Sequence, residues 1–195
     1  MKIVLTGGGT GGHFYPLIAV ADELNNIIDK EKLINARLIY MSDEPYNKRL
    51  LDEKGIRFKE ITTGKIRRYF SLLNIIDAIK IIFGALEALW IIYTDFPDVV
   101  FGKGGYASFP ALFAAKIFKI PVVIHESDFV PGRVNKWASK FAKRIAVSFP
   151  DSINYFPEKV RGKIAVTGNP VRKELLTLPK EGFSEFLQLE KTVPV

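Results

Sequence analysis

Short apolar runs alternate with longer amphipathic segments along most of the chain. Seven runs have the length and the β-branched or aromatic content of buried strands. They are Ile3–Thr6, Arg37–Met41, Arg57–Glu60, Val99–Phe101, Val122–His125, Ile145–Ser148 and Ile164–Val166. Helical periodicity is clearest over Pro16–Ile28, Leu72–Tyr93, Pro110–Phe118 and Arg133–Phe141. This alternation predicts a doubly wound, Rossmann-like α/β fold, with a parallel sheet covered by helices on both faces.

The pattern predicts one domain over residues 1–178, without internal repeats. Residues 179–195 begin with a Pro-Lys-Glu-Gly segment and end in Val-Pro-Val. We expect this segment to be a linker and the start of a second domain, which the sequence does not contain. The first apolar run is too short for a signal peptide, so we expect a cytoplasmic protein.

Composition narrows the class of protein. With 48% hydrophobic residues among 195, the chain can bury a core. It has no cysteine and two histidines, which argues against disulfides and against a metal site. A net charge of +7 favours an anionic partner, either phosphate groups, an acidic membrane surface or nucleic acid. The basic residues are scattered and no recognition motif is present, so we expect no nucleic acid partner.

The most distinctive local feature is a glycine-rich turn over residues 7–13, with the sequence GGGTGGH. It follows the first strand and precedes a helix whose first turn is expected to carry Pro16. Glycines allow close backbone approach, and free amides at a helix start attract phosphate. The spacing also fits a dinucleotide site, in which Asp43 or Glu44 would hold the ribose, although both lie farther along than the usual ~20 residues. A purely steric role for the glycines is a third reading.

Four further motifs follow in order. They are FGKGGYASFP at 101–110, IHESD at 124–128, PGRVNK at 131–136 and TGNPVR at 167–172. Together with GGTGGH at 8–13 and Pro16, they resemble the N-terminal half of the MurG family. The resemblance runs from Met1 to about Leu178.

This resemblance implies one half of a GT-B glycosyltransferase, an enzyme with two Rossmann domains and a cleft between them. The family transfers N-acetylglucosamine from UDP-GlcNAc to undecaprenyl-pyrophosphoryl-muramoyl-pentapeptide, converting lipid I to lipid II in peptidoglycan synthesis. The resemblance implies that this chain binds the polyprenyl-pyrophosphate acceptor, and that UDP-GlcNAc binds mainly to the absent domain. It implies no cofactor, and it implies that the chain alone is inactive.

The resemblance also assigns roles to individual residues. His13 matches the histidine proposed as general base, and Glu126 is a second catalytic candidate. The acceptor diphosphate is expected at Gly8, Gly9, Thr10, Gly11, Gly12, Gly104, Gly105, Tyr106 and Ser108. His125, Asp128 and Arg172 are expected to face the donor side of the cleft. For His125 and Glu126 a positioning role stays equally open.

One departure from the family concerns the two residues after Glu126. The family usually has Gln-Asn there, whereas this chain has Ser127-Asp128. A carboxylate repels a diphosphate where an amide would donate to it. The role of Asp128 in donor binding is therefore in doubt unless a nearby Lys or Arg neutralises it.

The long helix predicted over Leu72–Tyr93 carries an apolar stripe wider than one core contact needs. Its charged residues argue against a membrane-spanning helix. Either the whole stripe packs on the sheet, or part of it forms a patch on an anionic membrane, peripheral on the inner face of the cell membrane. The predicted patch comprises Ile75, Ile79, Ile82, Phe83 and Trp90 with the preceding Arg67 and Arg68.

Two rival functions stay open beside the transferase. The chain is either a non-catalytic subunit that binds the acceptor or recruits to the membrane and needs a separate donor-domain chain, or a dinucleotide-binding oxidoreductase module.

Overall fold

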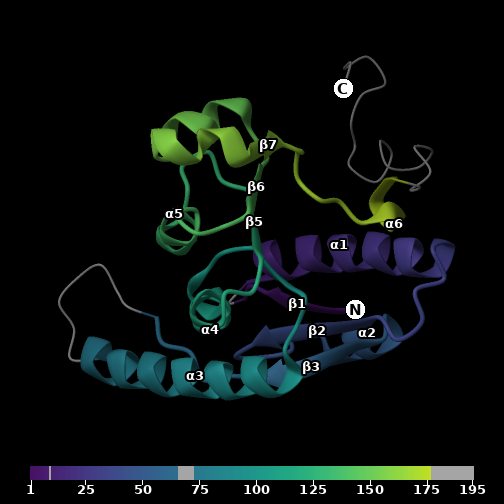
Figure 1. Ribbon diagram of the computed structural model, residues 1–195, viewed down its shortest axis with the longest axis horizontal. Coiled ribbons are helices and arrows are strands. Elements are labelled where there is room, and N and C mark those ends of the chain that lie inside the picture. Colours follow the sequence, from purple (N-terminus) through teal and green to yellow (C-terminus); the bar gives the residue numbers. More distant parts are fainter. Residues whose placement is uncertain (9, 66–72, 177–195) are drawn as a thin grey trace, which may run out of the picture.

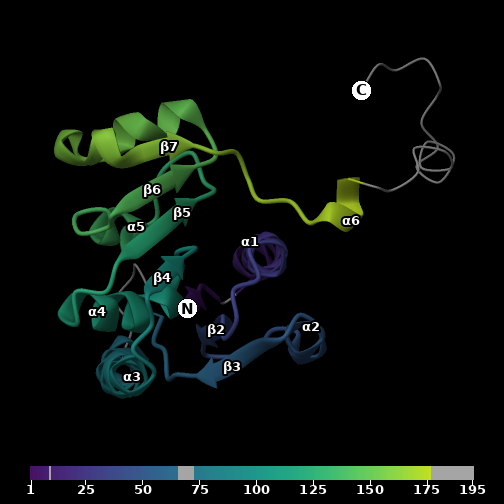
Figure 2. The ribbon, with the colours of Figure 1, turned by 45° about the vertical axis from the view of Figure 1, so that its right-hand side comes forward.

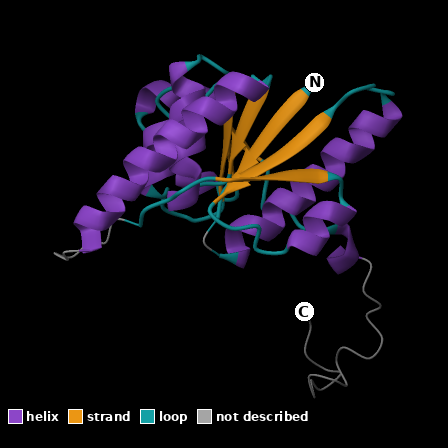
Figure 3. Ribbon diagram, turned by 90° about the horizontal axis from the view of Figure 1, so that it is seen from below, coloured by secondary structure: helices purple, strands orange, loops and turns teal. Residues whose placement is uncertain are grey.

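The computed structural model describes residues 1–8, 10–65 and 73–176. Seven parallel strands form one twisted sheet in the order β3-β2-β1-β4-β5-β6-β7 (Figure 3). The strands are β1 Lys2–Thr6, β2 Arg37–Ser42, β3 Ile56–Glu60, β4 Val99–Gly102, β5 Val122–Glu126, β6 Arg144–Val147 and β7 Ile164–Val166. The predicted doubly wound fold is therefore confirmed. The strand order reverses between β1 and β4, which is where open α/β sheets bind ligands.

Helices cover both faces of the sheet (Figures 1 and 2). They are α1 Gly11–Lys30, α2 Lys48–Glu53, α3 Leu73–Asp95, α4 Phe109–Ile117, α5 Arg133–Ala138 and α6 Lys173–Leu176. Three short 3-10 helices span Tyr106–Ser108, Pro150–Tyr155 and Glu158–Lys163. A hydrophobic core lies on each face of the sheet, and alternate residues of a strand point into different cores. In β1, Ile3 and Leu5 pack with α1 and α2, whereas Val4 packs with α3, α4 and α5.

Two predicted helix boundaries are wrong. Helix α1 begins at Gly11, so Pro16 lies in its second turn and not its first. The missing N–H of Pro16 would have bonded the carbonyl of Gly12, and Gly12 is exposed, so water can reach that carbonyl. Helix α5 ends at Ala138, before Phe141, because its last turn tightens to a bond from the Lys140 amide to the Trp137 carbonyl.

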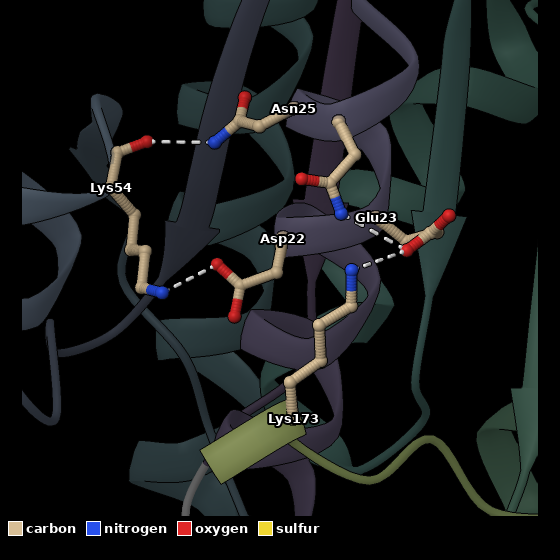
Figure 4. A network of polar contacts seen from close by, with 6 residues as sticks. Asp22, Glu23, Asn25, Lys54 and Lys173 are labelled. Atoms are coloured by element: carbon tan, nitrogen blue, oxygen red, sulfur yellow. Dashed lines mark hydrogen bonds and ion pairs between the residues drawn. The ribbon is translucent and has the colours of Figure 1, made fainter.

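The chain returns to α1 after β7 (Figure 2). There the Lys173 ammonium of α6 lies 3.2 Å from the Glu23 carboxylate of α1. On the neighbouring turn, Asp22 pairs with Lys54 at 2.7 Å and Asn25 donates to the Lys54 carbonyl (Figure 4). Because Lys173 and Glu23 are largely exposed, their pair stabilises the fold only modestly and serves to hold the returning segment in place.

Helix α3 approaches the segment after β3 closely, and glycines make this possible. A Cβ on Gly84 would lie 1.7 Å from the Thr62 carbonyl oxygen, and one on Gly64 would lie 2.1 Å from the Asp77 carbonyl oxygen. The Thr62 amide and hydroxyl donate to the Glu87 carboxylate at 2.5 and 3.1 Å. The face of α3 that meets the rest of the protein therefore has glycine at its closest contacts, and it also carries the fully buried Ala88 and Ile92.

We predict that Gly84→Ala destabilises the fold by about 3 kcal/mol, because the backbone of Thr62 must move to admit the methyl group. Alanine is intrinsically the better helix former by about 1 kcal/mol, so a net loss reports the contact itself. The matched control is Gly162→Ala, where a Cβ meets nothing within 4 Å. Urea unfolding should show the control within about 0.5 kcal/mol of the parent. Equal stability of the two variants would contradict the close approach.

Candidate functional site

Two glycine loops meet at the carboxyl edge of the sheet, where β1 and β4 lie side by side. The loop after β1 holds Gly8, which is buried, and a Cβ there would lie 2.2 Å from the Ser42 hydroxyl oxygen. The loop after β4 holds Gly105, where a Cβ would lie 3.0 Å from the Gly8 carbonyl oxygen. The two backbones are therefore in direct contact, which larger residues would prevent.

The second loop needs glycine for its conformation as well. Gly104 and Gly105 have φ of +86° and +80°, a region that favours glycine. The Asn135 amide packs against Gly104, and the Ser108 hydroxyl donates to the Gly105 carbonyl at 2.8 Å. Ser108 is buried, so its hydroxyl shapes the loop.

The first loop ends at the N-terminus of α1, a helix of 20 residues. Its N-cap, Thr10, makes no side-chain cap hydrogen bond, and the first turn carries no acidic residue. Thr10 and Gly12 are exposed, whereas Gly9 lies outside the described residues. Free amides and the positive end of the helix dipole suit this edge to an anion such as phosphate.

His13 lies half-buried where the two loops meet. Its Nε2 atom lies 3.2 Å from the position of a Cβ on Gly105. Burial, and secondly the charge of Lys103, lower the pKa of His13 below 6.5, against the opposing effect of the Asp128 and Glu126 carboxylates. The imidazole is therefore neutral at physiological pH and can accept a proton.

Glu126 lies at the end of β5 and is buried. Its carboxylate accepts hydrogen bonds from the Asp128 amide at 3.0 Å, the Gly132 amide at 2.9 Å and the Asn135 side chain at 2.9 Å. A carboxylate with these partners holds the loop over residues 127–132 in shape. Its geometry favours a positioning role, and its predicted catalytic role stays a prediction.

The residues expected on the donor side follow β5 and β7. His125 is buried, and its Nε2 lies 2.9 Å from the Gly168 carbonyl oxygen, which joins the two strand ends. Burial lowers the pKa of His125. Arg172 lies over the Tyr15 ring of α1 at 4.3 Å from its centroid, and Asp128 is exposed. Arg172 therefore sits beside α1, on the same side of the edge as His13.

Tyr106 of the second glycine loop faces the end of β2. Burial, and then the Asp43 and Glu44 carboxylates, raise the pKa of Tyr106 to about 12. Asp43 accepts hydrogen bonds from Ser42 at 3.0 Å and Thr63 at 2.7 Å. Of the two residues predicted to hold the ribose in a dinucleotide site, Asp43 and Glu44, the first is thus already engaged within the protein.

Sequence reasoning missed three polar residues at this edge. Lys103, in the second glycine loop, is 1% exposed, and its ammonium donates to the Ser127 hydroxyl. Ser127 in turn donates to the Asn169 side chain at 2.6 Å. A lysine flanked by glycines gives no signal of burial, because lysine is almost always exposed.

The apolar stripe of α3 is exposed. Ile75, Ile79, Ile82, Phe83 and Trp90 are between 50% and 68% accessible, because they lie away from the face of α3 that buries Ala88 and Ile92. Arg67 and Arg68 lie outside the described residues. Within the described chain, no helix is long and apolar enough to cross a membrane.

We predict that both histidines titrate below pH 6.5, because burial disfavours their charged forms. The chain has only these two, so proton NMR should show two imidazole signals, assigned with His13→Asn. The unfolded chain binds more protons between the folded pKa values and 6.5, so stability should fall as pH falls through this range. The same chain in urea is the control. A folded signal that titrates at or above 6.5 would refute the burial of that ring.

Comparison with known proteins places the site in a family. Residues 3–147 match the glycosyltransferase family 28 N-terminal domain. A UDP-N-acetylglucosamine–N-acetylmuramyl-(pentapeptide) pyrophosphoryl-undecaprenol N-acetylglucosamine transferase from Clostridium botulinum is 40% identical over 176 residues, which cover 90% of this chain and 47% of the relative. The transferase of the same name from Treponema denticola is 38% identical over 99% of this chain and 50% of the relative.

Among solved structures, the crystal structure of Acinetobacter baumannii MurG superposes with a TM-score of 0.66 and 28% identity, covering 88% of this chain and 46% of that one. The resemblance to the MurG family is thus confirmed. The chain spans about half the length of the curated relatives it matches. On the match over residues 3–147, the chain belongs to the glycosyltransferase family 28 N-terminal domain family.

Proposed function

We propose that this chain is the acceptor-binding half of a transferase that moves N-acetylglucosamine from UDP-GlcNAc to undecaprenyl-pyrophosphoryl-muramoyl-pentapeptide. The observation that carries the proposal is the meeting of the two glycine loops around a neutral His13. The relatives named for this reaction support the choice of substrates, and each is about twice as long as the part matched here.

In this proposal the acceptor diphosphate lies at the N-terminus of α1, where Thr10, Gly11 and Gly12 offer free polar groups. Tyr106 borders the same space from the second loop. The helix dipole and the backbone amides stabilise the diphosphate charge, and the sugar hydroxyl of the acceptor then lies beside His13.

The reaction itself needs a base and a stabilised leaving group. The acceptor hydroxyl attacks the anomeric carbon of the donor sugar, the bond to UDP breaks, and His13 takes the hydroxyl proton. UDP-GlcNAc is held mainly by the other half of the enzyme, with Asp128 and Arg172 facing it. His125 is buried against the Gly168 carbonyl and holds the ends of β5 and β7 together. Glu126 supports the site by holding the loop that carries Asp128.

The site argues against one of the two alternative functions and is compatible with the other. The engagement of Asp43 by Ser42 and Thr63, together with the family membership, argues against a dinucleotide-binding oxidoreductase module. A non-catalytic acceptor-binding subunit that works with a separate donor-domain chain shares every feature of the site. It differs from the leading proposal only in where the donor half resides.

We further propose that the exposed face of α3 rests on the inner surface of the cell membrane. Helix α3 follows β3 and so begins at the carboxyl edge of the sheet, beside the site. Lys65, just before it in the chain, lies over the Tyr106 ring at 5.9 Å from its centroid. Inserting about four large apolar side chains is worth roughly 4–8 kcal/mol, which suffices for reversible peripheral binding.

The test of the transfer reaction mixes this chain with UDP-GlcNAc and a lipid I analogue, with and without a separately produced donor-domain polypeptide. We expect no turnover by the chain alone and turnover when both halves are present. In an enzyme containing both halves, His13→Ala should lower kcat by about two orders of magnitude, because the base is lost. The acid limb of the parent's pH profile should lie below pH 6.5, where His13 becomes protonated.

The Michaelis constant for the acceptor is the internal control, since a base acts on kcat and leaves acceptor binding intact. Near-normal kcat in His13→Ala would remove His13 as the base. Turnover by the isolated chain would contradict the need for a donor half. Acceptor binding without turnover in any mixture would contradict the transfer reaction and leave acceptor binding alone.

For the membrane, we predict that replacing Ile79, Phe83 and Trp90 together by serine weakens binding to anionic phospholipid vesicles on the order of 100-fold. The side chains are exposed, so the fold should persist. The matched control replaces Ile27, Leu33 and Ile34, which are exposed at the far end of α1. Vesicle co-sedimentation at low salt measures both variants, and failure of the parent to pellet would end the proposal.

A further inference from the structure

Lys103 is the most unusual charged residue of the acceptor edge. It is 1% exposed and ranks among the largest fully buried side chains. Burying an ammonium is costly unless hydrogen bonds and opposite charges compensate for the lost water. The reaction described above does not use Lys103, so its burial calls for another explanation.

Hydrogen bonds tie Lys103, directly or through Ser127, to three other strand ends. Its ammonium donates to Ser127, after β5, and Ser127 donates to Asn169, after β7, at 2.6 Å. Its own amide donates to the Thr6 carbonyl of β1 at 2.8 Å. One residue thereby connects the ends of β1, β4, β5 and β7.

Two carboxylates, those of Glu126 and Asp128, act on Lys103, and they differ in their surroundings. Burial lowers the pKa of Lys103, whereas the Glu126 and then the Asp128 carboxylate raise it. Glu126 is already engaged by two backbone N–H groups of its own loop and by the Asn135 side chain of α5. Asp128 is exposed at the edge, so it is the carboxylate that an incoming anion would meet.

We propose that Lys103 is a positioning residue of the acceptor site, whose ammonium offsets the Asp128 carboxylate so that the glycine loops accept a diphosphate. This inference rests on the proposed function. Lys103 does not contact the diphosphate, because it is buried and held by Ser127. It acts through the charge that it places behind the two loops.

The proposal accounts for the departure at residues 127 and 128. Where the MurG family usually has the neutral pair Gln-Asn, this chain has a serine that accepts the lysine's hydrogen bond and an aspartate. The set of Lys103, Ser127 and Asp128 carries no net charge, as an amide pair carries none. Burial is the main cause of the lowered pKa of His13; within this set the Lys103 charge adds to that effect, whereas the Asp128 carboxylate opposes it.

The test is a double-mutant cycle on Lys103→Met and Asp128→Asn, with inorganic pyrophosphate as the probe and calorimetry as the measurement. Methionine keeps the apolar stem and removes the charge. We expect Lys103→Met to weaken pyrophosphate binding at least about tenfold and Asp128→Asn in that background to restore most of it. In the parent background, Asp128→Asn should tighten binding less than about threefold, because Lys103 already offsets the carboxylate.

A second readout is the pKa of His13 by NMR, which should rise in Lys103→Met. A purely structural role would give no rescue by Asp128→Asn. Additive effects in the cycle overturn the inference and leave the proposed function standing. If Lys103→Met fails to fold, tightening of more than about tenfold by Asp128→Asn alone overturns it. Absence of pyrophosphate binding by the parent overturns the diphosphate site itself, and this inference with it.

Discussion

The close approach of two backbones at the switch point between β1 and β4 is the constraint on which the site depends. The Gly8 carbonyl and the α-carbon of Gly105 lie so near that a methyl group at Gly105 would press on both Gly8 and His13. The parallel pairing of β1 with β4 brings the loops to the same edge, and the glycines let them touch. His13 then occupies the seam between the loops. A neutral imidazole and a free helix N-terminus are therefore consequences of the same packing.

Burial at this seam has an electrostatic consequence. The charges of Lys103 and Glu126 act on both His13 and His125 at this seam. Glu126 takes hydrogen bonds from its own loop, His125 contacts the Gly168 carbonyl, and Lys103 reaches Ser127. The histidines are neutral because they are buried near a cation. Such a network resists rearrangement, since breaking one contact leaves a buried polar group without a partner.

Much of the fold could be predicted from the sequence. The seven strands are regular, β-branched and bounded by turns, so periodicity found all of them within one or two residues, and the ordered motifs predicted the family. The short helix α2 was not predicted, because its six residues make fewer than two turns and show no helical periodicity. The start of α1 was missed because glycines and a proline disfavour helices, yet packing against Tyr46 fixes Gly11 there. At the site, the resemblance to the MurG family pointed to Glu126 but could not show that the loop after it would occupy the carboxylate.

Helix α3 packs against the protein with one face and exposes large apolar side chains on another. A wide apolar stripe normally predicts burial, and here another face of the helix, which carries Gly84, Ala88 and Ile92, makes the contact with the protein. Large side chains such as Trp90 are thereby left outside, and a fold gains nothing from exposing them. Because α3 begins at the carboxyl edge, an acceptor whose diphosphate lies at the glycine loops has its lipid on the side where α3 starts. In the proposed function, the transfer therefore takes place while the lipid of the acceptor stays in the membrane.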